Sequence, residues 1–243
     1  MREVPKQLAL DLPLEPRSGR EDFLVSPSNE AAYTLIEHWP DWPDTILLLT
    51  GPRGSGKSHL ASIWAATAKA WSAAARDVTA DRVPHLVSNG SVVIEDADQG
   101  PRDEAALFHL LNLAREVKAY VLIVCEAPPD AWGLKTPDLL SRLRLAPSIA
   151  LEAPDDALLR AVLVKLFVDR QLVVDTSVVD YIALRIERSL RRAAEIVAEL
   201  DREALSRGRR ISRPIAAAVL DSLGEGEEPD SPERGDEQKD DGE

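Results

Sequence analysis

The chain has 243 residues, of which 44% are hydrophobic and 29% are charged, as in a globular protein that buries a sizeable core. No apolar run approaches the roughly 18 residues that span a bilayer, and the N-terminus lacks the apolar core of a signal peptide. A net charge of −13 and the lack of a large basic patch disfavour direct DNA binding. The single cysteine, Cys125, cannot form an intramolecular disulfide, which favours a reducing, cytoplasmic environment.

The composition along the chain predicts four parts. Residues 1–20 form a proline-containing flexible arm, residues 21–153 an α/β domain, residues 154–223 a small helical domain and residues 224–243 a disordered tail. The tail has ten acidic residues against two basic ones, a net charge of −8, and no apolar residue. The other residues therefore carry a net charge of only −5.

In the second part, short apolar runs alternate with segments of helical periodicity. Strands are predicted at 45–50, 91–95, 120–125 and 149–151, and helices at 57–75 and 103–118. After Pro154 the pattern predicts only helices, at 155–171, 177–185, 189–207 and 212–223. The predicted fold class is thus α/β, with a parallel sheet flanked by helices and followed by a small all-helical lid.

A phosphate-binding loop is predicted between the first strand and the first helix. The sequence there is Gly51, Pro52, Arg53, Gly54, Ser55, Gly56, Lys57 and Ser58, followed by His59. In such a loop the glycines let backbone N–H groups curve around phosphate oxygens, and the lysine approaches the β and γ phosphates. The Ser58 hydroxyl is expected to ligate Mg²⁺, and the helix N-terminus adds its partial positive charge. We therefore predict that these residues bind a nucleoside phosphate.

Two carboxylates follow the strand at 91–95. We expect Glu95 to face the magnesium ion and Asp96 to polarise a water molecule, because acids at the end of a neighbouring strand serve phosphoryl transfer in this way. The alternative is that both are solvated acids at a strand end.

These features resemble the AAA+ ATPases, within them the DnaA-type replication initiators, and most of all the Hda family, DnaA-related regulators that inactivate the initiator. The resemblance spans about residues 5–223. Segments 23–25 and 29–32 resemble the initiator's entry segment, which implies that Asn29 lies near the adenine. Segment 137–143 resembles the one that carries an arginine finger, which implies Arg142 in this role, with Arg144 as the next candidate. Residues 189–192 resemble the sensor 2 turn of the lid, which implies Arg191.

The arm contains the sequence Gln7-Leu8-Ala9-Leu10-Asp11-Leu12, which resembles the sliding-clamp-binding peptide of Hda proteins. In an extended peptide, Leu10 and Leu12 would enter an apolar pocket while Gln7 forms hydrogen bonds at its rim, with Leu8 in the same segment. The alternative is that these leucines pack on the domain's own sheet.

Three departures from the initiators stand out. Only the acidic tail follows Leu223, where an initiator continues into a helix-turn-helix domain, so origin recognition is not expected. Glu95 stands where initiators have aspartate. Cys125 and Glu126 stand near the sensor 1 position, which usually holds a polar Asn, Ser or Thr. Turnover of ATP and a structural role for bound ADP both stay open.

The resemblance implies a nucleotide-binding regulator of chromosomal replication initiation. It would bind ADP or ATP with Mg²⁺, dock on the DNA polymerase sliding clamp, and present Arg142 in trans to ATP on the DnaA-type initiator. Its contact with DNA would be indirect, and a homo-oligomer is compatible with this role. The alternatives are a DnaC-like helicase loader or other AAA+ remodelling ATPase, a P-loop kinase, and an adaptor with a degenerate nucleotide site.

Overall fold

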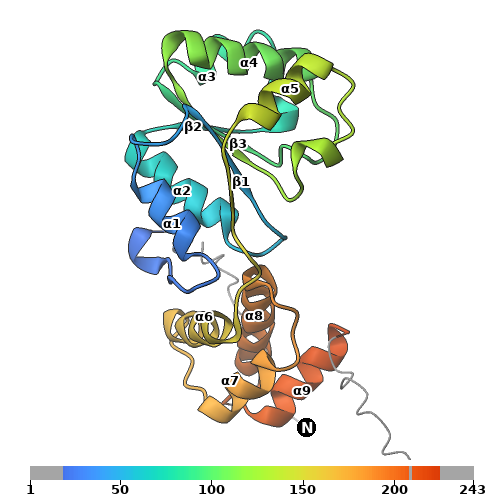
Figure 1. The fold of residues 1–243 in the computed structure, drawn as a ribbon. Helices are drawn as coiled ribbons and strands as arrows, with labels where there is room; N and C mark the ends of the chain where they lie inside the picture. The colour runs from blue at the N-terminus through green and yellow to red at the C-terminus, as the bar shows by residue number, and fades with distance from the viewer. Residues whose placement is uncertain (1–18, 208–209, 225–243) are drawn as a thin grey trace, which may run out of the picture.

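The computed structural model describes residues 19–207 and 210–224, so the predicted clamp-binding peptide and almost all of the acidic tail lie outside the described residues. Figure 1 shows an α/β domain with a group of helices below it. A five-stranded parallel sheet is flanked by helices and followed by helices alone, which confirms the predicted fold class. Within the described ranges, none of the helices combines the length and apolar character that a membrane span requires.

The sheet brings the ends of three buried strands to one edge. Its strands are β1 (Ile46–Thr50), β2 (Trp71–Ala74), β3 (Ser91–Glu95), β4 (Tyr120–Val124) and β5 (Ser148–Ala150), in the order β2-β3-β4-β1-β5. All neighbouring pairs are parallel, and β4 pairs with β1 on one side and β3 on the other. The carboxyl ends of β1, β3 and β4 therefore lie side by side, where ligands bind in open α/β sheets.

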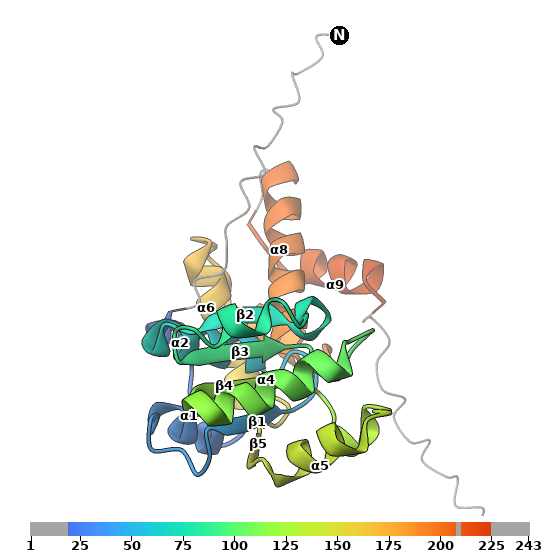
Figure 2. The ribbon, with the colours of Figure 1, turned by 90° about the horizontal axis from the view of Figure 1, so that it is seen from above.

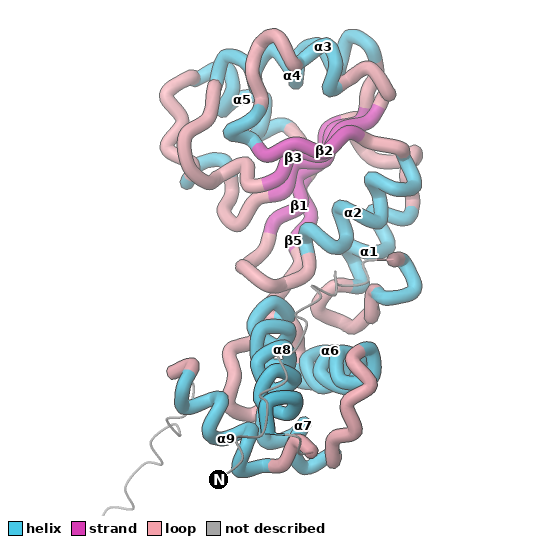
Figure 3. The backbone as a smooth tube through the Cα atoms, turned by 180° about the vertical axis from the view of Figure 1, so that it is seen from behind, coloured by secondary structure: helices cyan, strands magenta, loops and turns pink. Residues whose placement is uncertain are grey.

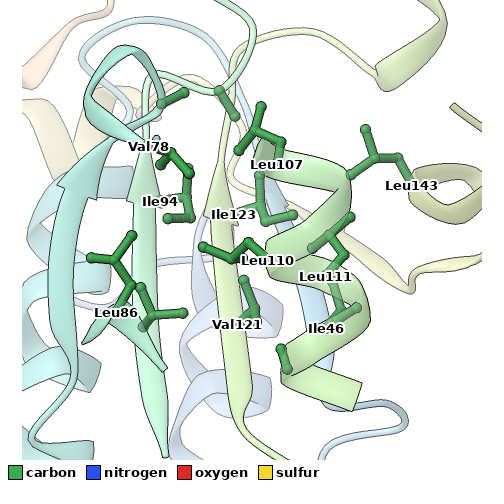
Figure 4. Packing of buried hydrophobic residues seen from close by; sticks show 14 of the residues in the cluster. Ile46, Val78, Leu86, Ile94, Leu107, Leu110, Leu111, Val121, Ile123 and Leu143 are labelled. Atoms are coloured by element: carbon green, nitrogen blue, oxygen red, sulfur yellow. The ribbon is translucent and has the colours of Figure 1, made fainter. Parts of the chain in front are cut away.

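Helices cover both faces of the sheet (Figure 2). They are α1 (Glu30–Glu37), α2 (Lys57–Ala68), α3 (Val83–Leu86), α4 (Glu104–Val117) and α5 (Pro137–Leu145), with short 3-10 turns η1 (Arg20–Asp22), η2 (Ala75–Asp77) and η3 (Pro129–Ala131). The cores of the two faces are separate clusters of buried side chains. Figure 4 shows one of them, where Leu110 and Leu111 of α4 face Ile94, Val121 and Ile123 of the sheet.

The lid consists of α6 (Asp156–Asp169), α7 (Thr176–Ala183), α8 (Leu190–Arg207) and α9 (Arg213–Ser222), which lie together in Figure 3. Their buried side chains form a core of their own. Side-chain caps fix where these helices begin. The Asp155 carboxylate accepts the Leu158 N–H at the start of α6, and Ser189 Oγ accepts the Arg192 N–H at the start of α8. Such caps satisfy N–H groups that the helix itself leaves without a partner.

The predicted helix at 57–75 was wrong beyond residue 68. The helix ends at Ala68 because Lys69 adopts a left-handed backbone conformation, with φ of 52°. Trp71–Ala74 then form strand β2 at the edge of the sheet, paired with β3. The segment has no apolar run that would indicate a strand, because two of its four residues are alanine. Its strand conformation therefore depends on pairing with β3.

Candidate nucleotide-binding site

The segment from Gly51 to Gly56 leaves β1 and turns directly into α2. Its backbone has positive φ at Gly51 (149°), Gly54 (73°) and Gly56 (104°), a region that favours glycine. A Cβ on Gly51 would lie 2.2 Å from the Leu151 carbonyl oxygen. Both the conformation and the space therefore require glycine in this loop.

Lys57, the first residue of α2, is turned back into the loop. Its side chain is buried, and Nζ donates hydrogen bonds to the carbonyls of Gly51 at 2.6 Å and Pro52 at 2.8 Å. Burial lowers the pKa of this lysine, while Glu126 and Asp98 oppose that effect. The loop thus holds a cation at its centre, as the binding of phosphate groups requires.

An acidic group lies directly opposite the start of α2. Ser58 Oγ donates to Glu95 Oε2 at 3.1 Å, which joins the first turn of α2 to the end of β3. Burial raises the pKa of Glu95, and Asp96 adds to the rise. Asp96 follows with φ of 53° and an exposed side chain.

The hydroxyl of Ser58 and the carboxylate of Glu95 are hard oxygen donors and fit Mg²⁺ chemically. No cluster of three or more His, Cys, Asp or Glu side chains able to hold a metal occurs in the described part of the chain. Such a small set of protein ligands suits a magnesium ion that is bound jointly with the phosphates of a nucleotide.

A cavity of about 170 Å³ brings together part of the predicted phosphate-binding loop and several other predicted site residues, although Gly51, Pro52 and Glu95 do not line it. It is lined by Arg53, Gly54, Lys57, Ser58, Asp96, Asp98, Cys125 and Arg191, among others. The structure therefore brings together the loop after β1, the acids after β3, the end of β4 and the first turn of α8. These segments are up to 138 positions apart in the sequence, counted from Arg53 to Arg191.

Asp98 also lines this cavity, although the sequence does not predict it as a site residue. Its Oδ2 accepts the backbone N–H groups of Glu126 and Ala127, both at 2.8 Å, so it joins the loop after β3 to the loop after β4. Burial, followed by the nearby Asp98, raises the pKa of Cys125 to about 12, which keeps this thiol neutral. In the sequence, Asp98 is recognisable only as a further acid two positions after Asp96. That position does not distinguish an acid that bridges two loops from one that is solvated.

A second cavity, of about 230 Å³, lies between the α/β domain and the lid. Phe23, Asn29 and His59 line it from one domain, and Leu158 and Leu190 from the other. Gly56 of the loop lines this cavity, whereas Gly54 lines the first. The loop therefore connects a mostly apolar cavity with a charged one, an arrangement that suits the base and the phosphates of one nucleotide.

Asn29 and His59 both fix the wall of the apolar cavity. The Asn29 amide donates to the Leu24 carbonyl and accepts the Ser26 N–H, each at 2.9 Å, so it holds the entry segment in place. The ring of His59 packs edge-on against Phe23, with centroids 5.3 Å apart, and its Nε2 lies 3.2 Å from the Gly19 carbonyl. Both predicted residues thus line the cavity and support its shape.

The start of α8 touches the phosphate-binding loop itself. The Leu190 N–H donates to the Gly54 carbonyl at 2.8 Å, and the buried Ser189 packs against Gly54. Next in the chain, Arg191 lines the phosphate cavity, with its Nε 3.6 Å from Glu195 Oε1. The lid and the loop are therefore in direct contact.

Arg142 and Arg144 lie apart from this site, on α5. Arg144 forms an ion pair with Asp130, and the hydrogen bond between them lowers the pKa of that carboxyl group. The guanidinium of Arg142 lies 5.2 Å from the centroid of the Phe108 ring. Across residues 19–207 and 210–224, no carboxylate lies within ion-pair distance of Arg142.

Neither a protein-family model nor a curated protein matches the sequence. Solved structures do match the fold. Domain III of the Thermotoga maritima replication initiation protein DnaA aligns with a TM-score of 0.71 and 19% identity, over 87% of this chain and 98% of that domain. AMPPCP-bound DnaA from Aquifex aeolicus aligns with a TM-score of 0.64 and 19% identity, over 80% of this chain and 68% of that protein.

A third structure extends the similarity beyond DnaA. The Thermotoga maritima RuvB Holliday junction branch migration motor aligns with a TM-score of 0.68 and 16% identity, over 86% of this chain and 74% of RuvB. Identities this low establish the fold alone. The chain has the fold of an AAA+ ATPase domain.

Proposed function

We propose that this chain is a nucleotide-binding, Hda-type regulator of replication initiation. It binds ADP or ATP with Mg²⁺ at the two connected cavities and docks on the sliding clamp through Gln7, Leu8, Leu10 and Leu12. It then presents Arg142 to the ATP held by a DnaA-type initiator. Its main effect is to stimulate hydrolysis by that partner.

The nucleotide part of the proposal is supported by the geometry of the loop. Lys57 and the backbone of residues 51–56 would hold the phosphates, while Ser58 and Glu95 would hold Mg²⁺. The ion would supply positive charge that neutralises the phosphate oxygens. The similarity of the fold to structures of DnaA bound to AMPPCP supports an adenine nucleotide.

The single observation that supports a role in trans is the difference between the two arginines of α5. Arg144 is neutralised by Asp130, whereas the charge of Arg142 is not paired with a carboxylate among the described residues. Arg142 lies on α5, which does not line the chain's own phosphate cavity, so this arginine is suited to the nucleotide of a neighbouring molecule. An arginine supplied in trans can accelerate phosphoryl transfer by about 10³ to 10⁵-fold.

The test measures hydrolysis of radiolabelled ATP bound to the initiator, with the clamp loaded on DNA. We expect Arg142→Ala to lose the stimulation while ADP binding is retained, and Arg142→Lys to restore little, because lysine lacks the planar fork of arginine. Arg144→Ala is the matched control, two positions further along the same helix. Full stimulation by Arg142→Ala would overturn the proposal, and loss in Arg144→Ala alone would transfer the role to Arg144.

A second candidate is a remodelling ATPase that hydrolyses its own ATP. It is favoured by the pairing of Ser58 with Glu95 and by Asp96 in the same cavity, which together provide acids beside the expected γ phosphate. Turnover by the isolated chain that Asp96→Asn abolishes would support this candidate over the regulator.

A further inference from the structure

A groove of about 410 Å³ lies on the lid, away from the nucleotide-binding site. Leu172 and Val173, which follow α6, line it together with Leu205 near the end of α8 and with Ile211 before α9. Val173 is 77% exposed and Leu205 is 65% exposed. Two large apolar side chains so exposed beside one groove indicate a surface that receives another apolar segment.

The N-terminal arm enters the described structure beside the same helix. The Asp22 carboxylate lies 2.7 Å from Lys165 Nζ of α6, and Lys165 also pairs with Asp169 at 2.6 Å. The groove begins at Gln171, two residues after α6 ends, so the ion pair of Asp22 with Lys165 and the groove lie toward the same end of this helix.

The length and chemistry of the arm fit the groove. Leu12 lies seven positions before Gly19, and a chain of that length spans up to about 23 Å when extended. From Lys165 to the end of α6 the helix rises only about 6 Å. The arm offers leucines at positions 8, 10 and 12 with Asp11 between them, and Arg210 lines the groove. The leucines of the arm therefore match the apolar lining of the groove, and Asp11 is opposite in charge to Arg210.

We propose that residues 8–12 of the arm dock into this lid groove of the same chain. The docking itself does not depend on a clamp, but its consequence rests on the proposed function. Because the same leucines would bind the clamp, the lid and the clamp compete for them. The apparent clamp affinity is then reduced by the fraction of molecules whose arm is free.

Disulfide trapping in the full-length chain tests the docking. Leu10→Cys is combined with Val173→Cys, and the control combines it with Val117→Cys, which is 52% exposed on α4 of the other domain. The native Cys125 is buried and does not compete. We expect an intramolecular disulfide several times faster in the first pair. Equal rates, or a disulfide between two copies of the chain, would overturn the proposal.

Clamp affinity tests the competition. We expect the combined change Val173→Asp and Leu205→Asp to tighten clamp binding at least about threefold, since a free arm is binding-competent. Val117→Asp is the control and should leave the affinity unchanged. Unchanged affinity in the double variant would refute competition. If neither the parent chain nor any of the variants binds the clamp, the proposed function fails, and the disulfide result alone decides whether the arm docks.

Discussion

Leu190 donates its backbone N–H to the carbonyl of Gly54 at 2.8 Å, so the first residue of α8 is hydrogen-bonded to the middle of the phosphate-binding loop. A change in the loop backbone on binding a nucleotide must either preserve this bond or move the lid. The position of the lid is thereby coupled to the state of the loop.

Replacing Gly54 with alanine should disrupt this contact. A Cβ there would lie 2.0 Å from Ser189 Oγ, and φ of 73° is strained for alanine by roughly 1–2 kcal/mol. Gly133→Ala is a matched control, because its φ is 66° but nothing lies within 4 Å. We expect Gly54→Ala to lower the melting temperature more than Gly133→Ala, in calorimetry, and to weaken ADP binding. Equal effects on both would show that the lid contact is unimportant.

Lys57→Ala should abolish tight nucleotide binding without unfolding the chain. The change removes the cation of the phosphate cavity and two hydrogen bonds to loop carbonyls, but no core side chain. Titration with fluorescent ADP measures the affinity, and circular dichroism monitors the fold. Lys135→Ala, at an exposed position in the loop between η3 and α5, is the control and should bind normally. Normal binding by Lys57→Ala would contradict the assignment of the loop.

Glu95→Gln and Glu104→Gln should shift thermal stability at pH 7 in opposite directions. Burial raises the pKa of Glu95, so its ionised form costs stability above that pKa, and the neutral amide should raise the melting temperature. The backbone N–H of Lys135 lowers the pKa of Glu104, so its charge stabilises the fold above the ordinary pKa and its loss should lower the melting temperature.

The same glutamate predicts a pH dependence of magnesium-assisted binding. Because its pKa lies above the ordinary 4.5, Glu95 is protonated, and unable to face Mg²⁺, at a higher pH than a solvated glutamate. ADP affinity in the presence of Mg²⁺ should therefore fall early on acidification. This fall should be absent from Glu95→Gln and from titrations without Mg²⁺; its persistence in both would assign the titration to another group.

Cys125 should resist alkylation in the folded chain. It is 1% exposed, and its pKa of about 12 leaves almost no thiolate at pH 8. Mass spectrometry after iodoacetamide treatment should find it unmodified in buffer and fully modified in guanidinium chloride. Rapid labelling in buffer would indicate that the end of β4 opens to solvent.

The local parts of this structure could be predicted from the sequence. The apolar run at 91–95 forms β3 over the same residues, and the glycine pattern around Lys57 gives a loop between a strand and a helix. Strand β2 could not be predicted, because Trp71–Ala74 has no pattern of its own and depends on pairing with β3.

The contacts of the site between segments far apart in the sequence could not be predicted either. The link from Asp98 to the backbone of Ala127, and the contact of Ser189 with Gly54, join segments whose spacing in the sequence has no periodicity to indicate proximity. The expected role of Arg191 came from resemblance, and the structure adds only that it lines the same cavity as Lys57.

Both edges of the sheet are poor templates for a further strand. The edge strand β2 has four residues, and β5 has three residues directly preceded by Pro147, which has no N–H to donate. Short edges limit the row of unpaired backbone groups on which another chain could build. Assemblies of this protein should therefore form through helix surfaces, and the folded domain should resist the edge-to-edge association that leads open sheets to aggregate.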